Sequence, residues 1–320
     1  MSSPLDVICL GELLIDFVPK PSYSPLSQSR LLRLAPGGAP ANVAVATQRL
    51  GLSSGFIGKV GDDPFGRYLR DVLKQKGLNL NLFTLSPAAL TRLAFVTNDS
   101  NEQQRFLFYG NPGADGLLRS DEIEESYLQR ARIFHFGSIS LIQEPSRSAT
   151  LTAIDYAYKH GLIVSFDPNV RPALWPSLKR ARQEILKALN HCHILKMNQS
   201  EWEFLFPGKR FEDSLSMLER KGIGLSAITL GAQGSIIGSY NQWTKIRAPQ
   251  VKVVDTTGAG DGFMAGLLYE VLKRDKKRLR FEKSELQEIA RFANVVGALT
   301  VTKVGAIPAF PSLSHVKKYL

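Results

Sequence analysis

Short apolar runs and segments of helical periodicity alternate through the middle of the chain. Parallel neighbouring strands need a crossover connection, usually a helix, so this alternation predicts βαβ units and a doubly wound α/β sheet. The predicted order is strand 133–136, helix 145–160, strand 162–166, helix 178–189 and strand 193–197. Nearer the N-terminus, apolar runs predict buried strands at 5–11 and 56–60, the second followed by a helix to about residue 76.

A different pattern, in which polar and apolar residues alternate, marks three shorter segments. It predicts half-buried strands at 30–35, 91–97 and 105–109. Together with residues near Asp16, these strands are expected to form a small sheet beside the main domain, built from about 12–36 and 90–112.

The most informative stretch is the heptad Asp255-Thr256-Thr257-Gly258-Ala259-Gly260-Asp261. Val251 and Val253 alternate with Lys252 before it, which predicts a short strand, and apolar residues recur at helical spacing after it. A glycine turn at a helix N-terminus presents unpaired backbone N–H groups and the positive end of the helix dipole. Such a place suits an anion, and phosphate is the usual one.

Asp261 has two interpretations at this position. A carboxylate at a helix start commonly caps free N–H groups. Beside a phosphate site, however, a negative charge works against binding. It makes sense there as a base that takes the proton from a hydroxyl group attacking the phosphorus.

Composition narrows the class of protein. The chain has 320 residues, enough for one large α/β domain with a small appendage or for two modest domains. Its 44% hydrophobic and 22% charged residues are ordinary for a globular protein, and no apolar run reaches the roughly 18 residues of a membrane helix. No basic region precedes the apolar residues 7–10, so no signal peptide is predicted. Cys9 and Cys192 are far apart, and we expect reduced thiols in a cytoplasmic protein.

The net charge of +11 raises the question of nucleic-acid binding. Most basic residues are dispersed, and the one dense run, 273–280, falls where the helix after the heptad is expected to end. Cations are favourable at a helix C-terminus and in a solvated loop. We therefore expect no nucleic-acid partner.

A second glycine-rich stretch, Gly37-Gly38-Ala39-Pro40-Ala41-Asn42, leads into a predicted helix. A turn before a helix of small residues explains the glycines but not Asn42, a poor residue for a helix interior. With the heptad, this stretch resembles the two signatures of the PfkB (ribokinase-like) carbohydrate kinases. The resemblance covers essentially the whole chain. It implies a ribokinase-like three-layer α/β fold, one domain over 1–320, and a small β-sheet lid over the sugar.

The resemblance also implies roles for single residues. Asp261 would be the catalytic base, and Gly258, Ala259 and Gly260 would form the anion hole for the transferred phosphate. The residues implied at the sugar are Asp16, Gly37, Gly38 and Asn42. Arg171 lies just past a predicted strand, at the edge where open sheets bind ligands, and we expect it to bind substrate rather than only to form a surface ion pair.

For the nucleotide, the resemblance implies ATP and Mg²⁺. Asn198 and Glu201 match an Asn-x-x-Glu element, in which Glu201 would act on Mg²⁺ through water, although the same spacing also describes a helix cap. Thr229, Gly231 and Gly234 would lie on the phosphates and ribose, and Asn294 near the adenine. A K⁺ site is suggested at Asp255, Thr257 and the carbonyl groups of about 300–305.

Within the family, the likeness is greatest to fructokinases of the plant and bacterial type, so fructose and ATP are the expected ligands. The near alternative is a 2-keto-3-deoxygluconate kinase, whose anionic substrate could be held by Arg105 and Arg171. A distant alternative is a nucleotide-binding protein without activity. The chain departs from the family at Gly113, Gly116 and Gly262. The exposed lid sheet could support a homodimer.

Overall fold

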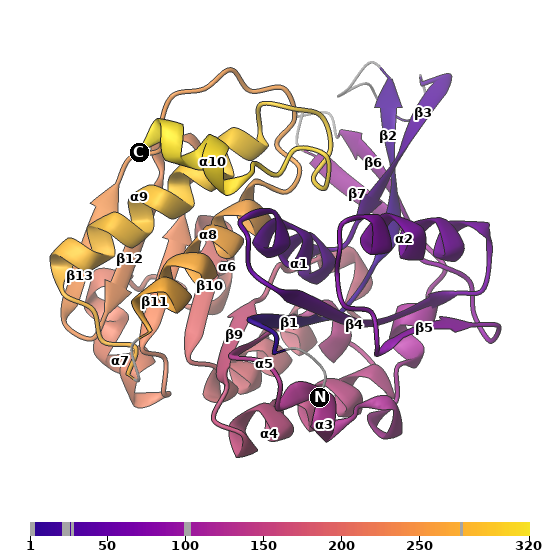
Figure 1. Ribbon diagram of the computed structural model, residues 1–320, viewed down its shortest axis with the longest axis horizontal. Helices are drawn as coiled ribbons and strands as arrows, with labels where there is room; N and C mark the ends of the chain where they lie inside the picture. Colours follow the sequence, from indigo (N-terminus) through magenta and orange to yellow (C-terminus); the bar gives the residue numbers. More distant parts are fainter. Residues whose placement is uncertain (1–3, 21–25, 27–28, 99–103, 276–277) are drawn as a thin grey trace.

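Nine strands form the large sheet, in the order β13-β12-β11-β10-β9-β8-β1-β4-β5 (Figure 1). The structure is a computed structural model that describes residues 4–20, 26, 29–98, 104–275 and 278–320. Neighbouring strands from β5 to β11 are parallel, but β11, β12 and β13 pair antiparallel, so the sheet is mixed. The strands are β1 Val7–Leu10, β4 Ser54–Gly61, β5 Phe83–Ser86, β8 Ile133–Gly137, β9 Ile163–Asp167, β10 Ile194–Asn198, β11 Leu225–Thr229, β12 Ser235–Ser239 and β13 Gln242–Ile246.

Helices cover both faces of this sheet, because both faces of its strands are apolar. Along β1, Val7 and Cys9 belong to one hydrophobic core, whereas Ile8 and Leu10 belong to the other. The helices of the first core are α1 Ala39–Arg49, α2 Pro64–Gln75, α8 Ala259–Arg274, α9 Lys283–Thr300 and α10 Leu313–Val316. Those of the second are α3 Glu125–Leu128, α4 Ser146–Lys159, α5 Leu178–Ala188, α6 Gln199–Leu205 and α7 Leu215–Arg220. The predicted three-layer, ribokinase-like α/β fold is confirmed.

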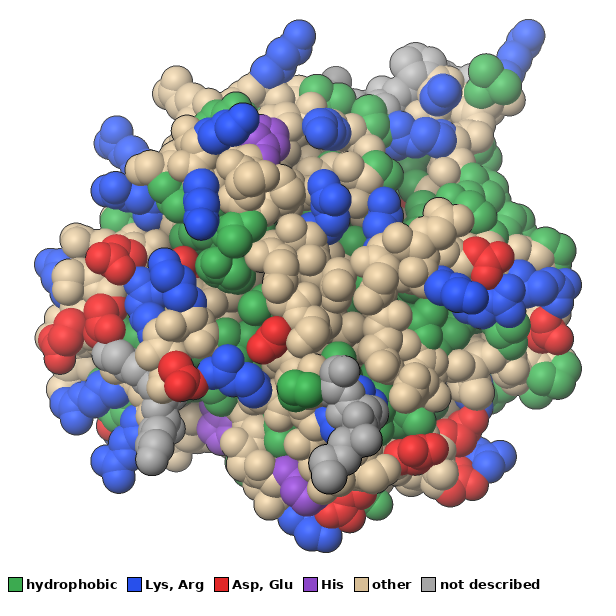
Figure 2. All heavy atoms as spheres, viewed as in Figure 1, with side chains coloured by type: hydrophobic (Ala, Val, Ile, Leu, Met, Phe, Trp, Pro, Cys, Tyr) green, Lys and Arg blue, Asp and Glu red, His purple; other side chains and the backbone are tan. Residues whose placement is uncertain are grey.

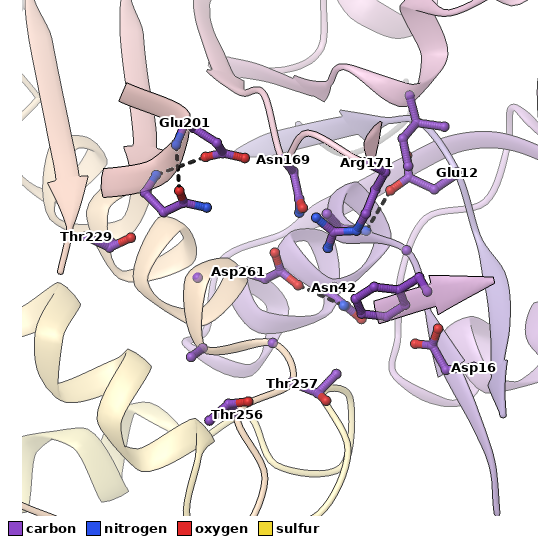
Figure 3. Close-up of a pocket in the computed structure, with 18 of the residues that line it drawn as sticks. Glu12, Asp16, Asn42, Asn169, Arg171, Glu201, Thr229, Thr256, Thr257 and Asp261 are labelled. Carbon is purple, nitrogen blue, oxygen red and sulfur yellow. Dashed lines mark hydrogen bonds between the residues drawn. The ribbon is translucent and has the colours of Figure 1, made fainter. Parts of the chain in front are cut away.

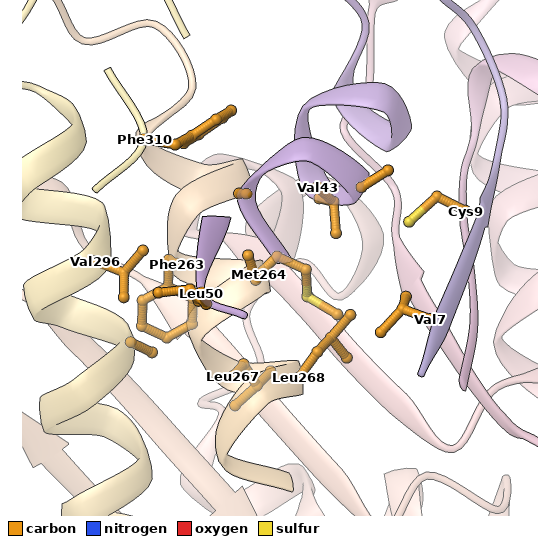
Figure 4. Close-up of a cluster of buried hydrophobic side chains, with 14 of the residues drawn as sticks. Val7, Cys9, Val43, Leu50, Phe263, Met264, Leu267, Leu268, Val296 and Phe310 are labelled. Carbon is orange, nitrogen blue, oxygen red and sulfur yellow. The ribbon is translucent and has the colours of Figure 1, made fainter. Parts of the chain in front are cut away.

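Helix α8, which follows the glycine turn of the heptad, packs between α1 and α9 (Figure 4). Phe263, Met264, Leu267 and Leu268 are buried in this core. Small residues let the helices approach: a Cβ atom at Gly262 would lie 2.6 Å from Thr300 Oγ1. The departure from the family pattern at residue 262 therefore has a packing reason, since the α9 threonine occupies the space of an alanine methyl group.

Four further strands form a separate, smaller sheet in the order β3-β2-β6-β7, beside the large one (Figure 1). These strands are β2 Leu14–Lys20, β3 Leu31–Gly37, β6 Leu93–Asn98 and β7 Gln104–Tyr109. Strands β3, β6 and β7 match the segments predicted from polar and apolar alternation, and β2 contains Asp16, near which a fourth segment was expected. Because β2 begins four residues after β1 ends, the smaller sheet stands next to the carboxyl end of β1.

The strand predicted at 251–253 is wrong. The segment between β13 and α8 is irregular, and the Val253 side chain is 56% exposed. Its backbone bonds to a helix end instead of a neighbouring strand: Val254 and Asp255 donate their N–H groups to the Val301 carbonyl at the end of α9. Two alternating valines are therefore not enough to place a segment in a sheet.

In the part of the chain that the structure describes, no helix is long and apolar enough to span a bilayer. On the face in Figure 2, Lys and Arg side chains are distributed over several elements. Asp and Glu side chains lie among them in the middle and lower parts of the view, whereas the upper part shows mainly Lys and Arg.

Candidate active site

A cavity of about 420 Å³ opens at the carboxyl ends of the central strands, beside the smaller sheet (Figure 3). The chain leaves β1 toward β4 on one side and later returns as β8 on the other, and ligands in open sheets bind at such a switch point. The polar side chains that line it are Glu12, Asp16, Asn42, Asn169, Arg171, Lys196, Asn198, Glu201, Thr229, Thr256, Thr257 and Asp261.

A second cavity, of about 560 Å³, adjoins the first. Both are lined by Thr229, Gly231, Thr256, Ala259 and Gly260, so the glycine turn of the heptad separates them. The lining of the second cavity includes the apolar side chains of Val251, Val253, Phe263, Ala298 and Val301. An elongated ligand with an apolar ring at one end and charged groups at the other fits this arrangement.

The glycine turn ends at the first turn of α8. Gly258 precedes the helix at φ 79°, a left-handed conformation that glycine adopts without strain. A Cβ atom at Gly258 would lie 2.6 Å from the Ala306 methyl group, and one at Gly260 would lie 2.8 Å from Lys196 Nζ. The turn thus brings the unpaired N–H groups of a helix N-terminus to the cavity, at the place predicted for the anion hole.

Asp261 lies in the first turn of α8 and is 7% exposed. Asn42 Nδ2, from α1, donates a hydrogen bond of 2.8 Å to Asp261 Oδ2. Burial raises the pKa of Asp261 to about 6, with a further contribution from Asp167, while the Asn42 hydrogen bond and the charge of Lys196 oppose the shift. The residue is therefore mostly ionised at neutral pH and has the proton affinity that a general base needs.

Asp16 faces the same cavity from β2. Burial raises the pKa of Asp16 to about 7, opposed by the charge of Arg171. Gly37 lies next to Asp16, and a side chain at Gly37 would collide with the Asp16 carboxylate. Gly38, at φ 110°, lines the cavity and begins α1. The first glycine makes room for Asp16, and the second allows the turn into the helix.

Sequence reasoning missed Glu12 as a site residue. This side chain is 3% exposed, and its Oε1 accepts a hydrogen bond of 2.8 Å from the Ala39 N–H. It caps α1 from a distance, because Gly38 has no side chain to do so. Burial raises the pKa of Glu12 to about 7, although its backbone hydrogen bonds oppose the shift. No short-range signal connects Glu12 with a helix that begins 27 residues later.

Asp167 and Lys196 were also missed, and they form a buried ion pair. Lys196 Nζ donates to Asp167 Oδ2 at 2.7 Å, with the two side chains 6% and 2% exposed. Burial opposes the charge of Lys196, but Asp167, Glu201 and Asp261 outweigh it and raise the pKa of the ammonium group. The available signal was a lysine within an otherwise apolar strand, Ile194-Leu195-Lys196-Met197.

Asn198 and Glu201 form the predicted helix cap at the start of α6. The Asn198 side chain accepts from the Glu201 N–H at 2.8 Å, and Glu201 Oε2 accepts from the Asn198 N–H at 2.9 Å. The other carboxylate oxygen, Oε1, accepts from the Val170 N–H at 2.7 Å. Burial and the nearby Asp167 raise the pKa of Glu201. Both residues line the first cavity, so the cap also faces a ligand site.

Of the two predicted arginines, Arg171 lines the first cavity, and its guanidinium lies 5.1 Å from the centre of the Phe106 ring on β7. This contact joins the large domain to the smaller sheet. Arg105 pairs with Thr97 in the register of β6 and β7, and its side chain is outside the described part of the structure.

Four of the residues predicted for the nucleotide lie around the second cavity, whereas Asn198 lines the first. Thr229, Gly231, Gly234 and Asn294 all line the second cavity. Gly231 and Gly234 have φ values of 57° and 94°, which turn the chain from β11 into β12. Asn294 Nδ2 donates to the Ile246 carbonyl at 3.1 Å. These four residues therefore come together around the more apolar of the two cavities.

Asp255 does not line either cavity. Its Oδ1 accepts from the backbone and the side chain of Thr257, at 2.9 and 2.6 Å, and its Oδ2 accepts from the Gly305 N–H at 2.8 Å. Arg33 Nη2, from β3, lies 3.6 Å from Asp255 Oδ2. Asp255 therefore ties the heptad to the loop after α9 and to the smaller sheet.

A profile of the pfkB family carbohydrate kinases matches residues 5–313. The chain belongs to this family.

Among the relatives, fructokinase-1 of Zea mays is 44% identical over 311 residues, covering 97% of this chain and 96% of its own. A fructokinase from Xylella fastidiosa, solved with bound ATP, superposes with a TM-score of 0.88 at 31% identity, covering 98% and 97% of the two chains. A double mutant of a Vibrio cholerae fructokinase, with fructose, ADP and a potassium ion bound, has a TM-score of 0.86 at 31% identity and full coverage of both chains. The predicted family is therefore confirmed.

Proposed function

We propose that this protein is an ATP-dependent fructokinase that transfers the γ-phosphate of ATP to the 6-hydroxyl group of D-fructose. The observation that carries the proposal is Asp261, which is held by Asn42 at the first turn of α8, beside the anion hole. Fructokinases at 40–44% identity over nearly the whole chain support the choice of sugar.

In this mechanism the sugar occupies the first cavity and the adenine the second, so that the phosphates lie at the glycine turn which both cavities share. Asp261 takes the proton of the sugar hydroxyl group, whose oxygen attacks the γ-phosphorus, and ADP leaves as the bond between this phosphorus and the β,γ-bridging oxygen breaks. The N–H groups at Gly258, Ala259 and Gly260 stabilise the charge that develops on the transferred phosphoryl group.

Asp16, Gly37, Gly38 and Asn42 hold the sugar, and Gly37 contributes by leaving room for the Asp16 carboxylate. Asn42 Oδ1 is buried without a partner, which leaves it available to a sugar hydroxyl group once Nδ2 is bound to Asp261. The smaller sheet acts as a lid, formed from about 12–36 and 90–112, and excludes water that would compete as a nucleophile. The contact between Arg171 and Phe106 supports this closure.

Mg²⁺ on the ATP phosphates supplies charge neutralisation during transfer. Two buried carboxylates fit such a metal: Glu201 lines the first cavity, and Asp167 is bonded to Lys196 of the same lining. Glu201, through water, and the Asp167 Oδ1 atom, which is buried without a partner, are the carboxylates available to it.

K⁺ is proposed as an activator that Asp255, Thr257 and the carbonyl groups of about 300–305 hold. These are oxygen ligands, which suit a hard cation, and the potassium ion of the Vibrio cholerae fructokinase supports the idea. The ion would share Asp255 with Arg33, whose Nη2 atom is buried and has no hydrogen-bond partner.

A homodimer through the smaller sheet is supported by four exposed side chains on β3 and β7, namely Leu31, Leu32, Leu107 and Tyr109. We also expect the protein to work in the cytoplasm. The two buried free thiols, Cys9 and Cys192, support a reducing compartment.

The second candidate is a 2-keto-3-deoxygluconate kinase, which Arg171 favours because its cationic side chain lines the sugar cavity. We would measure ADP release from ATP with fructose, 2-keto-3-deoxygluconate, ribose, glucose or no sugar, each with Mg²⁺ and K⁺. Turnover with fructose alone is expected. Turnover with the keto-acid would support the same mechanism with a different substrate. If no sugar gives ADP release while ATP still binds, the proposed kinase activity is refuted.

A further inference from the structure

We propose that Lys196 is a phosphate-binding residue of this site, whose ammonium group contacts the phosphate chain of the nucleotide at the anion hole. The inference rests on the proposed kinase function and adds a residue to it. Its basis is the position of the ammonium group between a carboxylate and a backbone turn that come from two other parts of the chain.

The strand places Lys196 toward the site. Side chains alternate along β10, so that Leu195 and Met197 enter the core beneath α6, while Ile194 enters the core beneath α8. Lys196 therefore points to the α8 side, one pleat beyond Ile194 and at the carboxyl end of the strand. A lysine at this buried position loses much of its hydration, which is costly unless a partner or a ligand compensates.

The hydrogen bonds of the ammonium group offset only part of this desolvation cost. Lys196 Nζ carries three protons and donates one of them to Asp167 Oδ2 at 2.7 Å. Among the described residues, Asp167 is the one side chain found to bond to this ammonium group. On its other side, Nζ stands 2.8 Å from the position that a Cβ atom would take at Gly260. The ammonium group thus reaches the anion hole itself, with donors still available.

The charges around the cavity indicate why a cation is needed there. Four carboxylates line the first cavity, Glu12, Asp16, Glu201 and Asp261, against two cations, Arg171 and Lys196. A nucleotide triphosphate is strongly anionic and would be repelled by such a lining. Arg171 contacts Phe106 on the smaller sheet, so Lys196 is the cation beside the turn that both cavities share.

A purely structural role is the alternative, since buried ion pairs often do no more than satisfy each other. The two roles differ in how nucleotide affinity depends on the number of phosphates. An ammonium group that contacts the phosphate chain strengthens binding of a non-hydrolysable ATP analogue far more than that of AMP. A structural ion pair affects all nucleotides alike, because its loss disturbs the whole site.

The test is calorimetric titration of AMP, ADP and a non-hydrolysable ATP analogue into Lys196→Met, without sugar. We expect affinity for the ATP analogue to fall ~10–100-fold, as for loss of one hydrogen bond to a charged group, with AMP changed less than ~2-fold. Lys59→Met is the matched control, because Lys59 is also a buried lysine in an ion pair, with Glu122, and lies outside both cavities. It should leave the ratio of the affinities unchanged.

Equal losses for all three nucleotides, or no loss, would overturn the proposal. If Lys196→Met does not fold because Asp167 is left unpaired, the double variant Lys196→Met with Asp167→Asn removes both charges. It is titrated without Mg²⁺, for which Asp167 is a candidate ligand, and a loss that grows with the number of phosphates is expected of it as well. The titrations contain no sugar, so they stand apart from the assay of the proposed function. A loss of affinity that grows with the number of phosphates, together with no turnover on any sugar, would refute the proposed kinase activity and support the contact between Lys196 and phosphate.

Discussion

Removal of the Asn42 side chain should change the pH dependence of the reaction, because Asn42 holds Asp261 in its ionised form. Asn42 Nδ2 donates to Asp261 Oδ2 at 2.8 Å in a buried environment, and donation to the carboxylate lowers its pKa. Asn42→Leu keeps the branched shape of the side chain with a larger volume, and it offers no donor. The pKa of Asp261 should therefore rise above its present value of about 6.

The size of the shift follows from the hydrogen bond. A buried hydrogen bond to a charged group contributes roughly 1.5–3 kcal/mol, which corresponds to about one or two pKa units. The pKa of Asp261 would then move to roughly 7–8, and its ionised fraction at pH 7 would fall from about nine-tenths to between about a half and a tenth. The variant should lose activity at pH 7 through this effect and regain that part of it by pH 9.

The assay is kcat/KM for fructose from pH 5 to 9, since this parameter reports the ionisation of the free enzyme. A loss of sugar contacts alone would lower kcat/KM equally at every pH. The matched control is Asn294→Leu, a buried asparagine that lines the second cavity, and its acid limb should stay in place. An acid limb at the same pH in Asn42→Leu and in the parent protein would refute the reasoning.

Three further predictions follow from the site. Asp261→Ala should lower kcat ~10²–10⁴-fold and still bind ATP, and equal turnover would remove Asp261 as the base. Arg33→Met should lower the K⁺ concentration needed for half-maximal activity, because it frees Asp255 from a cation 3.6 Å away. An unchanged K⁺ requirement would show that Arg33 does not affect a K⁺ site. Asp16→Asn should stabilise the ligand-free protein by on the order of 2–4 kcal/mol at pH 8 and by much less at pH 5. The sign follows because the folded pKa of Asp16, about 7, is raised above its ordinary 3.8, so stability falls as pH rises between these values. Thermal unfolding at both pH values tests this, and equal gains would contradict it.

The local parts of the site could be read from the amino-acid sequence. A glycine turn, a left-handed residue before a helix and the unpaired N–H groups of that helix depend on neighbouring residues only, so the heptad predicted the turn, the start of the helix and the position of Asp261 in its first turn. The same holds for the cap between Asn198 and Glu201, which lie three residues apart. Alternation of polar and apolar residues was enough for three strands of the smaller sheet, β3, β6 and β7, because side chains in a strand alternate between its faces.

The tertiary structure alone decided which distant side chains share one cavity. Lys196, Asp167 and Gly260 meet because β9 and β10 are adjacent and α8 begins at their carboxyl ends, an arrangement that no local pattern encodes. Glu12 caps a helix 27 residues away, and Gly37 leaves the space that the Asp16 carboxylate occupies. The pKa values of the carboxylates likewise depend on burial, which only the packed chain produces. The sequence by itself therefore determined the kinds of chemical group at the site, and the fold determined their contacts and their charge.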